Sequence, residues 1–395
     1  MTKTDSIAKL RAWWSNKQGL DGRLQGALPA AVLAASGWAR GLGGVSPYLA
    51  LYARAGISRE AADAAVNSLE IHELPAARNC TYVVPSADYA VALKAGAGFS
   101  TDVRTVGKLG VPERGIEQLC AKVEAALAKG PLEPDTIRDA VGPAVRNLGE
   151  EGKKKGVTTT LPVALGVLQT EGRIRRISLN GRFDQQRYKY ALWKPGPLAR
   201  TNLTAEQTAI ELARRFFRWT GPATLFDFQT FSGWSQKVAK AAIEPLKLVS
   251  LEGDLLLLPE DCDAFAEFQP PKTADYRLVS GIDGIRTLRS GAPSIVDDGD
   301  QKRIAALDLK GYGPSELIGH MIVDRGRMVG IWEFNPETES IVYVPFIARN
   351  KDLEKAVART EQFIREQLGD ARSFSLDSIK SRAPRLAALS KAAGK

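Results

Sequence analysis

The sequence predicts a mainly helical α+β protein in which a unit of three helices and a β-hairpin recurs, followed by a β-rich C-terminal domain. Three observations lead to this fold class. The length of 395 residues favours several domains. Helical periodicity closed by a hairpin signal appears in two stretches and more weakly in a third. Strand-like alternation is sustained only after residue 270.

The clearest unit runs from Thr204 to Pro259. Its first predicted helix is capped by Thr204 and stops at Gly221-Pro222. A second helix follows, and Ser235 can cap a third. Two short strands around Glu252-Gly253-Asp254 then form a hairpin. This order is that of a winged helix, in which the third helix commonly enters the major groove of DNA and the hairpin contacts its backbone.

The same order is predicted in an earlier stretch of the chain. Residues 134–142 and 143–152 supply two short helices, and residues 158–172 a third. Residues 173–193 then read as a wing with a turn at Asn180-Gly181, because Asn-Gly is the strongest short hairpin signal. A weaker third copy starts near Leu28. Its last helix is predicted over residues 57–69 and its wing over residues 70–85.

The remaining third of the chain has a different texture. Residues 271–349 alternate apolar and polar side chains around turn signals, which predicts a meander, a sheet or a small barrel. A helical pattern returns at residues 351–369. The basic, alanine-rich end from residue 378 is predicted to be loosely ordered. It could be a second, non-specific DNA contact or a solubilising tail, and its cations are Lys380, Arg382, Arg385, Lys391 and Lys395.

These patterns predict five regions. They are an N-terminal winged-helix-like domain (1–105), a basic second winged helix (106–200), a third winged helix (201–270), a β-rich domain (271–349), and a C-terminal helix with a basic tail (350–395).

Several classes of protein do not fit the sequence. Three scattered cysteines form no disulfide framework, and two histidines make a zinc site improbable. The sequence has no signal peptide and no apolar run of membrane-spanning length. We therefore expect a cytoplasmic, nucleoid-associated monomer that uses no metal and no other cofactor and does not bind a membrane.

The positive charge is concentrated in one segment. The whole chain carries a net charge of +9, and residues 146–194 hold eleven lysines and arginines against four acids. Their positions fall before the predicted third helix and on its wing, the parts of a winged helix that approach DNA. Cations there would displace counterions from phosphates. One face of the wing, with Tyr188 and Tyr190, could instead be core.

The candidate DNA-binding residues combine cations, which neutralise phosphates, with polar and aromatic groups, which contact bases. They are Lys153, Lys154, Lys155, Thr158, Thr159, Arg173, Arg175, Arg176, Arg182, Gln185, Gln186, Arg187 and Tyr188. The predicted partner is duplex DNA, intact or damaged.

Four long stretches resemble the winged-helix DNA glycosylases of the AlkZ/YcaQ type. They are residues 46–56 (SPYLALYARAG), 76–89, 214–228 and 320–334. The resemblance covers most of the chain in the family's order. It implies three tandem winged helices with a concave DNA-binding surface, a β-rich C-terminal domain, and excision of alkylated or crosslinked bases without a metal or redox cofactor.

The catalytic part of the resemblance is absent. Family enzymes place a Gln-x-Gln or Gln-x-Asp pair just ahead of the segment that matches SPYLALYARAG, to position the attacking water. Residues 36–45 here (SGWARGLGGV) contain no glutamine, aspartate or glutamate. Base hydrolysis needs a group that orients or deprotonates water. The substitutes nearby are Asp88, Glu73, His72 and Glu70, each of which could equally be an ordinary surface or hairpin residue.

Three functions follow for comparison. The first is a DNA-repair protein that recognises alkylated or crosslinked bases and, if it is an enzyme, is a metal-independent DNA N-glycosylase. The second is a non-catalytic DNA-binding protein such as a transcriptional regulator. The third is a protein-docking scaffold that does not bind DNA.

Asp283 with Arg286, and His320 with Asp324, are acid–base pairs of a kind that occurs by chance.

Overall fold

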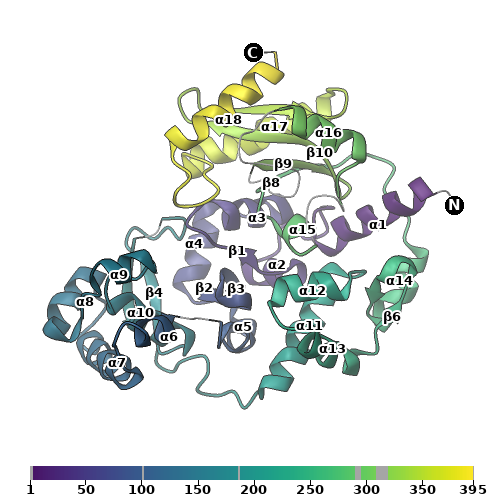
Figure 1. Ribbon diagram of the computed structural model, residues 1–395. Coiled ribbons are helices and arrows are strands. Elements are labelled where there is room, and N and C mark those ends of the chain that lie inside the picture. The colour runs from purple at the N-terminus through teal and green to yellow at the C-terminus, as the bar shows by residue number, and fades with distance from the viewer. Residues whose placement is uncertain (1–2, 100–101, 186, 290–294, 308–318, 395) are drawn as a thin grey trace. The chain divides into compact units, whose positions relative to one another are not determined.

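The computed structural model describes residues 3–99, 102–185, 187–289, 295–307 and 319–394. The protein is a mixed α+β molecule in which helices dominate and the strands form small sheets, as the sequence predicts (Figure 1). The chain divides into two compact units. The larger unit comprises Met1–His72, Val83–Ser86 and Ala209–Lys395, and the smaller unit comprises Glu73–Tyr82 and Ala87–Thr208.

The N-terminal elements follow the order that the sequence predicts for the weakest copy. A helix forms over 59–67 because Ser58 accepts a hydrogen bond from the Ala61 N–H and so caps it. The strands of the predicted wing follow, and the short strand β1 adds to them in the order β1-β3-β2. The elements are α1 (Lys3–Lys17), α2 (Pro29–Ser36), β1 (Ala39–Arg40), α3 (Ser46–Ala55), α4 (Arg59–Asn67), β2 (Ile71–Pro75), η1 (Ala77–Asn79), β3 (Thr81–Pro85) and η2 (Ser86–Asp88).

The smaller unit has its own apolar core. One face of a long amphipathic helix (α7) packs against α8 and α10, where Leu119, Val123, Ile137 and Leu168 are almost fully buried. This helix was not predicted from the sequence. The elements are α5 (Tyr89–Gly96), α6 (Asp102–Gly107), α7 (Glu113–Leu127), α8 (Pro134–Val141), η3 (Gly142–Ala144), α9 (Gly149–Lys154), α10 (Leu161–Thr170), β4 (Ile174–Ser178) and β5 (Tyr188–Leu192).

The hairpin of the smaller unit is longer than its Asn-Gly signal predicts. β4 and β5 pair antiparallel from Ile174↔Leu192 to Ser178↔Tyr188. The connection is therefore a loop over residues 179–187 rather than a two-residue turn. Local side-chain bonds hold this loop, because the Asn180 amide donates to the Gln185 side chain and the Arg182 guanidinium donates to the Asp184 carboxylate. These side-chain hydrogen bonds stabilise the loop, where the strand pairing of β4 and β5 has ended.

The unit that begins at Thr204 matches its prediction closely. Thr204 caps the first helix through the Gln207 N–H, and Ser235 accepts from the Val238 N–H at the start of the third. Thr224 and Asp227 form a reciprocal capping box on the second helix. The elements are α11 (Ala205–Thr220), α12 (Leu225–Ser232), α13 (Gln236–Ile243), η4 (Glu244–Leu246), β6 (Val249–Ser250), η5 (Glu252–Asp254) and β7 (Leu256–Leu257), followed by η6 (Pro259–Asp261) and α14 (Cys262–Glu267).

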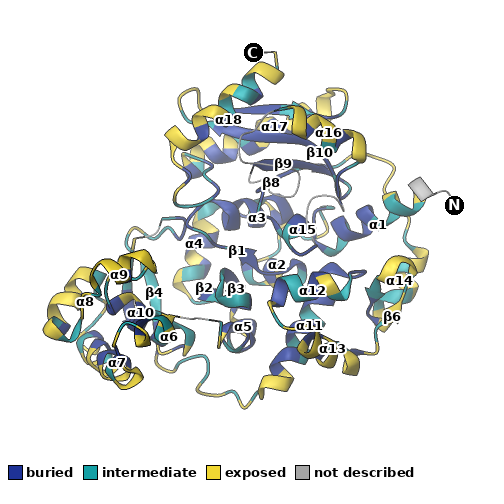
Figure 2. Cartoon of the chain, in the orientation of Figure 1, coloured by how far each residue is buried: buried dark blue, intermediate teal, exposed yellow. Residues whose placement is uncertain are grey.

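A four-stranded antiparallel sheet of order β11-β10-β9-β8 forms the β-rich region that the sequence predicts. Its strands are almost entirely buried, because α17 contacts β8 and α18 contacts β10 and β11 (Figure 2). The elements are β8 (Tyr276–Val279), α15 (Gly284–Thr287), α16 (Asp298–Ala306), β9 (His320–Asp324), β10 (Arg327–Asn335), β11 (Ser340–Pro345), α17 (Lys351–Phe363), the π-helix η8 (Ile364–Leu368) and α18 (Ile379–Ala392).

The prediction of a loosely ordered C-terminal end is wrong. Ser378 caps α18 by accepting from the Ser381 N–H, and the helix extends to Ala392. Leu389 is fully buried in the apolar core of the larger unit. The alanine-rich composition that suggested weak order is also the composition of a good helix former that packs closely on a sheet.

Candidate nucleic-acid interface

The basic segment lies on three neighbouring elements of the smaller unit. Lys153 and Lys154 are in the last turn of α9, and Lys155 follows it. All three residues are exposed. The lysines were predicted to lie in the turn before the third helix, whereas Lys153 and Lys154 lie on a short helix ahead of it. The remaining cations lie on the β4–β5 hairpin and its loop.

Four of the candidate cations have acidic partners within the smaller unit: Arg173, Arg182, Lys153 and Arg176. Arg173 forms ion pairs with Glu124 and Glu171. Arg182 donates to Asp184. Lys153 lies 2.6 Å from Glu150, in a pair that is exposed on both sides. An exposed pair of this kind contributes little to stability and exchanges readily. Arg173 and Arg182 neutralise acids of their own unit and add less to any positive surface than the sequence suggests.

Arg176 and Tyr188 face inward from the hairpin. The Arg176 guanidinium stacks over the Tyr188 ring at 4.9 Å from its centroid and lies 3.7 Å from the Glu73 carboxylate. The Tyr188 hydroxyl donates to Glu73 at 3.0 Å. Tyr190 is on the same strand face and belongs to the apolar core. The sequence left open that the hairpin face with Tyr188 and Tyr190 belongs to the core. This alternative is correct for Tyr190, whereas Tyr188 forms a hydrogen bond within the protein.

The opposite face of the hairpin is cationic. Side chains alternate across a strand, so Arg175 and Lys189 project from the face opposite Arg176. No acidic side chain in the described ranges pairs with Arg175, Lys189 or the exposed Arg187. Burial lowers the pKa of the half-buried Arg175 from its ordinary value, with a smaller opposing effect of Tyr89. Together with Lys154 and Lys155, these residues form what we call the cationic set: Lys154, Lys155, Arg175, Arg187 and Lys189.

The polar candidates are placed unevenly. Thr158 is exposed and Thr159 half-buried just before α10, where the backbone of Thr159 bridges to Asn147. The Gln185 side chain accepts from Asn180 at 2.6 Å, which ties it to the loop. Gln186 lies outside the described residues.

Residues 36–45 form an apolar and glycine-rich wall that the chain itself covers. The Val45 N–H donates to the Arg372 carbonyl at 3.0 Å, and the Ser375 N–H donates to the Leu42 carbonyl at 2.9 Å. A Cβ atom at Gly44 would lie 2.5 Å from the Arg372 carbonyl oxygen, closer than real Cβ contacts come. The stretch in which the family places its catalytic pair therefore packs against residues 372–375 of the larger unit. It offers no carboxylate or amide side chain.

A small cavity beside Ser36 contains a buried polar network. Its volume, about 10 Å³ for the centre of a water-sized sphere, admits roughly one water molecule. Arg54 and Asp283 pair there through two hydrogen bonds of 2.8 Å, with side chains only 4% and 0% exposed. The Gln18 side chain accepts from Arg54 and donates to the Trp219 carbonyl. Arg54, Asp283 and Gln18 each have a hydrogen-bond partner, so these three side chains form a structural network.

The substitute catalytic residues differ in their surroundings. Glu70 is exposed and accepts a hydrogen bond from Ser68. His72 on β2 and Asp88 at the start of α5 are only 2% and 6% exposed. His72 is thus a residue of the predicted hairpin, whereas the interpretation of Asp88 as a surface residue is wrong. Glu73 is the candidate that lines a larger pocket, together with Arg176. Burial raises the pKa of the Glu73 carboxyl, and Arg176 and Tyr188 oppose that shift.

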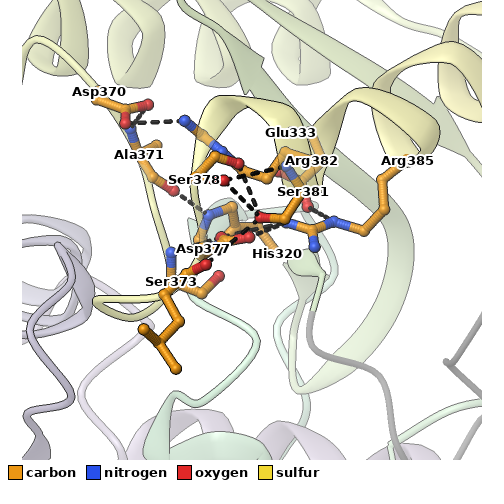
Figure 3. Close-up of polar contacts among 11 residues, drawn as sticks. His320, Glu333, Asp370, Ala371, Ser373, Asp377, Ser378, Ser381, Arg382 and Arg385 are labelled. Atoms are coloured by element: carbon orange, nitrogen blue, oxygen red, sulfur yellow. Dashed lines mark hydrogen bonds and ion pairs between the residues drawn. The ribbon is translucent and has the colours of Figure 1, made fainter.

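Two C-terminal cations are buried in ion pairs, so they cannot form the DNA contact considered for the tail. Arg385 donates to both Glu333 and Asp377, and Arg382 donates to Asp370 (Figure 3). Arg382 is 0% exposed and Arg385 5%. Lys380 and Lys391 remain exposed, and Lys395 lies outside the described residues.

The same C-terminal cluster contains His320. Its Nε2 lies 2.6 Å from the Ala371 carbonyl, and its ring stacks on Trp332. Burial lowers the pKa of His320 to about 4, against a smaller raising effect of the bond to Ala371. The neutral imidazole thus helps to hold residues 370–377, rather than forming a site with Asp324, which instead pairs with Arg325.

Sequence patterns missed the buried network at Ser36. Arg54 is a single arginine in an apolar helix, and Gln18 is far from it in the chain, so no spacing joins them. Within the described ranges, no cluster of three or more histidine, cysteine, aspartate or glutamate side chains could hold a metal ion. No described helix has both the length and the apolar character to span a membrane.

Comparisons with known proteins agree with the resemblance noted in the sequence. No curated protein matches the chain. Among solved structures, the Streptomyces sahachiroi DNA glycosylase AlkZ is similar with a TM-score of 0.67 and 18% identity, covering 92% of this chain and 97% of that one. This likeness shows a shared fold. The family model described as DNA glycosylase AlkZ-like matches residues 44–363, and the chain therefore belongs to the AlkZ-like DNA glycosylase family.

Proposed function

We propose that this protein binds double-stranded DNA, intact or damaged, through three tandem winged helices and acts in DNA repair. The winged helices would span residues 1–105, 106–200 and 201–270, followed in the chain by the β-rich domain (271–349) and the C-terminal helix (350–395). The recurrence of three helices and a hairpin supports this division. Family membership supports DNA as the partner. We further propose a monomer in the cytoplasm, associated with the nucleoid.

One observation supports the DNA-binding proposal: the cationic set lies ahead of α10 and on the β4–β5 hairpin and its loop. In a winged helix these are the parts that approach the duplex. Lys154 and Lys155 lie ahead of α10, the helix in the position of the recognition helix. Arg175, Arg187 and Lys189 lie on the hairpin and loop that form the wing. Phosphate binding by such cations releases counterions, so affinity should fall steeply with salt concentration.

The salt dependence of duplex binding tests this proposal. Replacing Lys154 and Lys155 together by alanine should weaken binding and reduce the slope of log Kd against log salt by up to about 1.8. The matched control is the pair Lys351→Ala and Lys355→Ala, which removes two exposed lysines from α17 of the larger unit. Fluorescence anisotropy with a labelled duplex measures both. An unchanged slope in the Lys154/Lys155 variant would show that these lysines do not contact DNA phosphates. If the wild-type protein bound no duplex at low salt, a protein-docking scaffold would be favoured.

We infer that the protein does not excise bases with the groups that the family uses. Residues 36–45 supply no side chain that orients water, and Gly44 and Val45 pack against residues 372–375. Incubation with a duplex carrying an alkylated purine or a crosslink should give DNA binding without abasic sites. Appearance of abasic sites would contradict this expectation and would mean that a group outside residues 36–45 activates the water, and Glu73 would then be the first residue to replace.

A further inference from the structure

A second pocket lies in the smaller unit. It is bounded by β2 and the turn after it, by the second half of α10 and by β4, and we call it the Glu73 pocket. Its volume is about 120 Å³ for the centres of water-sized spheres, roughly ten times what one water needs. A flat ring can enter a space of this size. The polar residues used below are Glu73, Asn79, Gln169 and Arg176.

The pocket contains buried polar groups whose hydrogen-bonding capacity is not used. The Asn79 amide oxygen and the Arg176 Nε–H are both buried, and neither has a hydrogen-bond partner in the described structure. The Glu73 side chain is 7% exposed, and its contacts with Tyr188 and Arg176 both fall on Oε2. A buried polar atom without a partner costs about 1–3 kcal/mol. A ligand that satisfied these atoms would recover that energy.

The turn that carries Asn79 has an unusual backbone. Arg78 and Asn79 both have positive φ values, 56° and 55°. Left-handed conformations at non-glycine residues cost on the order of 1–3 kcal/mol and collect at ligand clamps. The strained turn carries Asn79, which lines the pocket together with Glu73.

The helix α10 contributes a glycine where the pocket needs space. Gly166 lies inside α10 and lines the pocket, and a Cβ built on it would meet no atom within 4 Å. Glycine inside a helix costs roughly 1 kcal/mol relative to alanine. The open volume beside Gly166 therefore gives a direct way to fill the pocket from the rigid wall of the helix without touching its polar groups.

The polar pattern selects one class of ligand. The Glu73 carboxylate and the Asn79 oxygen accept hydrogen bonds, so they favour a group with N–H donors and disfavour an anion such as phosphate. Arg176 Nε offers one donor for a ring nitrogen or carbonyl. A nucleobase has such an edge of donors beside acceptors. The walls include α10 and β4, two elements that we place at the DNA.

We propose that the Glu73 pocket receives one base of the bound duplex, turned out of the stack, and holds the hydrogen-bonding edge of that base on Glu73 and Asn79. This inference rests on the proposed DNA binding. Enzymes that act on or inspect a base hold it in a pocket of this kind, and unstacking costs a few kcal/mol that the pocket contacts offset. Mismatched or damaged bases cost least to unstack, so they should be preferred.

The experiment uses the full chain and a duplex with one 2-aminopurine opposite a mismatched base, because the fluorescence of 2-aminopurine rises when it leaves the stack. The wild type and Gly166→Ala should both raise the fluorescence by about three-fold or more on binding. Gly166→Phe, which fills the pocket, should bind the duplex by anisotropy but lose the rise. Glu73→Gln keeps the shape of the side chain and should reduce the rise without changing the fold, as circular dichroism verifies.

The outcomes separate the two proposals. Binding without a fluorescence rise in the wild type, or a rise that persists in both Gly166→Phe and Glu73→Gln, would overturn the pocket and leave DNA binding standing. Failure of the wild type to bind any duplex at low salt would overturn both. If Gly166→Phe proves unfolded, Glu73→Gln alone decides between loss and retention of the rise.

Discussion

The backbone of Gly44 lies so close to that of Ser373 that a Cβ atom at position 44 would stand 2.4 Å from the Ser373 carbonyl group. The neighbouring Val45 is bonded through its N–H to Arg372. A larger side chain at this place must therefore displace backbone rather than a flexible side chain. The absence of a catalytic glutamine and the close approach of residues 372–375 are two aspects of one local structure.

Substitution at Gly44 should destabilise the protein. Gly44→Ala is expected to lower the free energy of unfolding by about 1–3 kcal/mol, because it forces atoms into a packed backbone contact. Urea denaturation measures this change. Gly115→Ala on α7 is the control, since its Cβ would make only ordinary contacts of 3.7 Å or more, and it should be neutral or slightly stabilising. A neutral Gly44→Ala would show that residues 372–375 move away easily.

The buried pair of Arg54 and Asp283 should be sensitive to the loss of one partner. Arg54→Met leaves the Asp283 carboxylate in the core without its counterion and should cost about 3–5 kcal/mol of unfolding free energy. The comparison is Arg138→Met, which breaks an exposed pair with Asp135 and should cost under about 1 kcal/mol. Equal effects of the two substitutions in urea denaturation would refute the structural importance given to the network.

Glu333 should make stability depend on pH. Burial raises the pKa of Glu333 to about 7, although the guanidinium of Arg385 opposes the shift. A carboxyl whose pKa is raised on folding binds its proton more tightly in the folded state. Its stabilising contribution is thus complete below the unfolded pKa and is lost as the pH rises toward 7.

The comparison of wild type with Glu333→Gln isolates this effect. The wild type should lose on the order of 2 kcal/mol relative to the variant between pH 5 and pH 8, measured by urea denaturation at each pH. His320, whose pKa is lowered on folding, makes the folded state less stable as the pH falls. Because His320 is present in both proteins, its effect cancels in the comparison. A difference that stays constant with pH would show that Glu333 ionises normally.

The C-terminal cations should matter for stability rather than for DNA. Arg385→Ala leaves Glu333 and Asp377 without their shared partner and should cost about 3–5 kcal/mol of unfolding free energy. Lys391→Ala, an exposed cation on the same helix, should be neutral. DNA affinity of the folded fraction should be unchanged by either substitution, as anisotropy can check. A loss of affinity with full stability would restore the tail as a DNA contact.

Local signals explain most of what the sequence predicted about the fold. Capping residues such as Thr204 and Ser235 act within one helical turn, so their patterns are visible in the chain and the structure places helices where they predict. The β-rich region was visible because alternation is also local. The length of the hairpin loop over 179–187 could not be predicted from the sequence. The loop is held by a side-chain hydrogen bond between Asn180 and Gln185, and sequence rules for turns do not describe such bonds.

Site residues were harder to predict than elements, because charge alone does not reveal a partner. Arg173 and Glu124 are far apart in the chain, as are Arg176 and Glu73, and only folding joins them. The same holds for the tail, where Arg382 and Arg385 looked like free cations and are instead buried. Lys154 and Lys155 kept their predicted exposure, because no acid of α9 reaches them in the described structure.

The order of α18 has a practical consequence for anyone who shortens this chain. The helix covers one face of β10 and β11 and inserts Leu389 among core side chains. A chain ended after Gly369 would bare that apolar face to water and leave the carboxylate of Glu333 without Arg385. Such a fragment should aggregate during purification more readily than the intact protein.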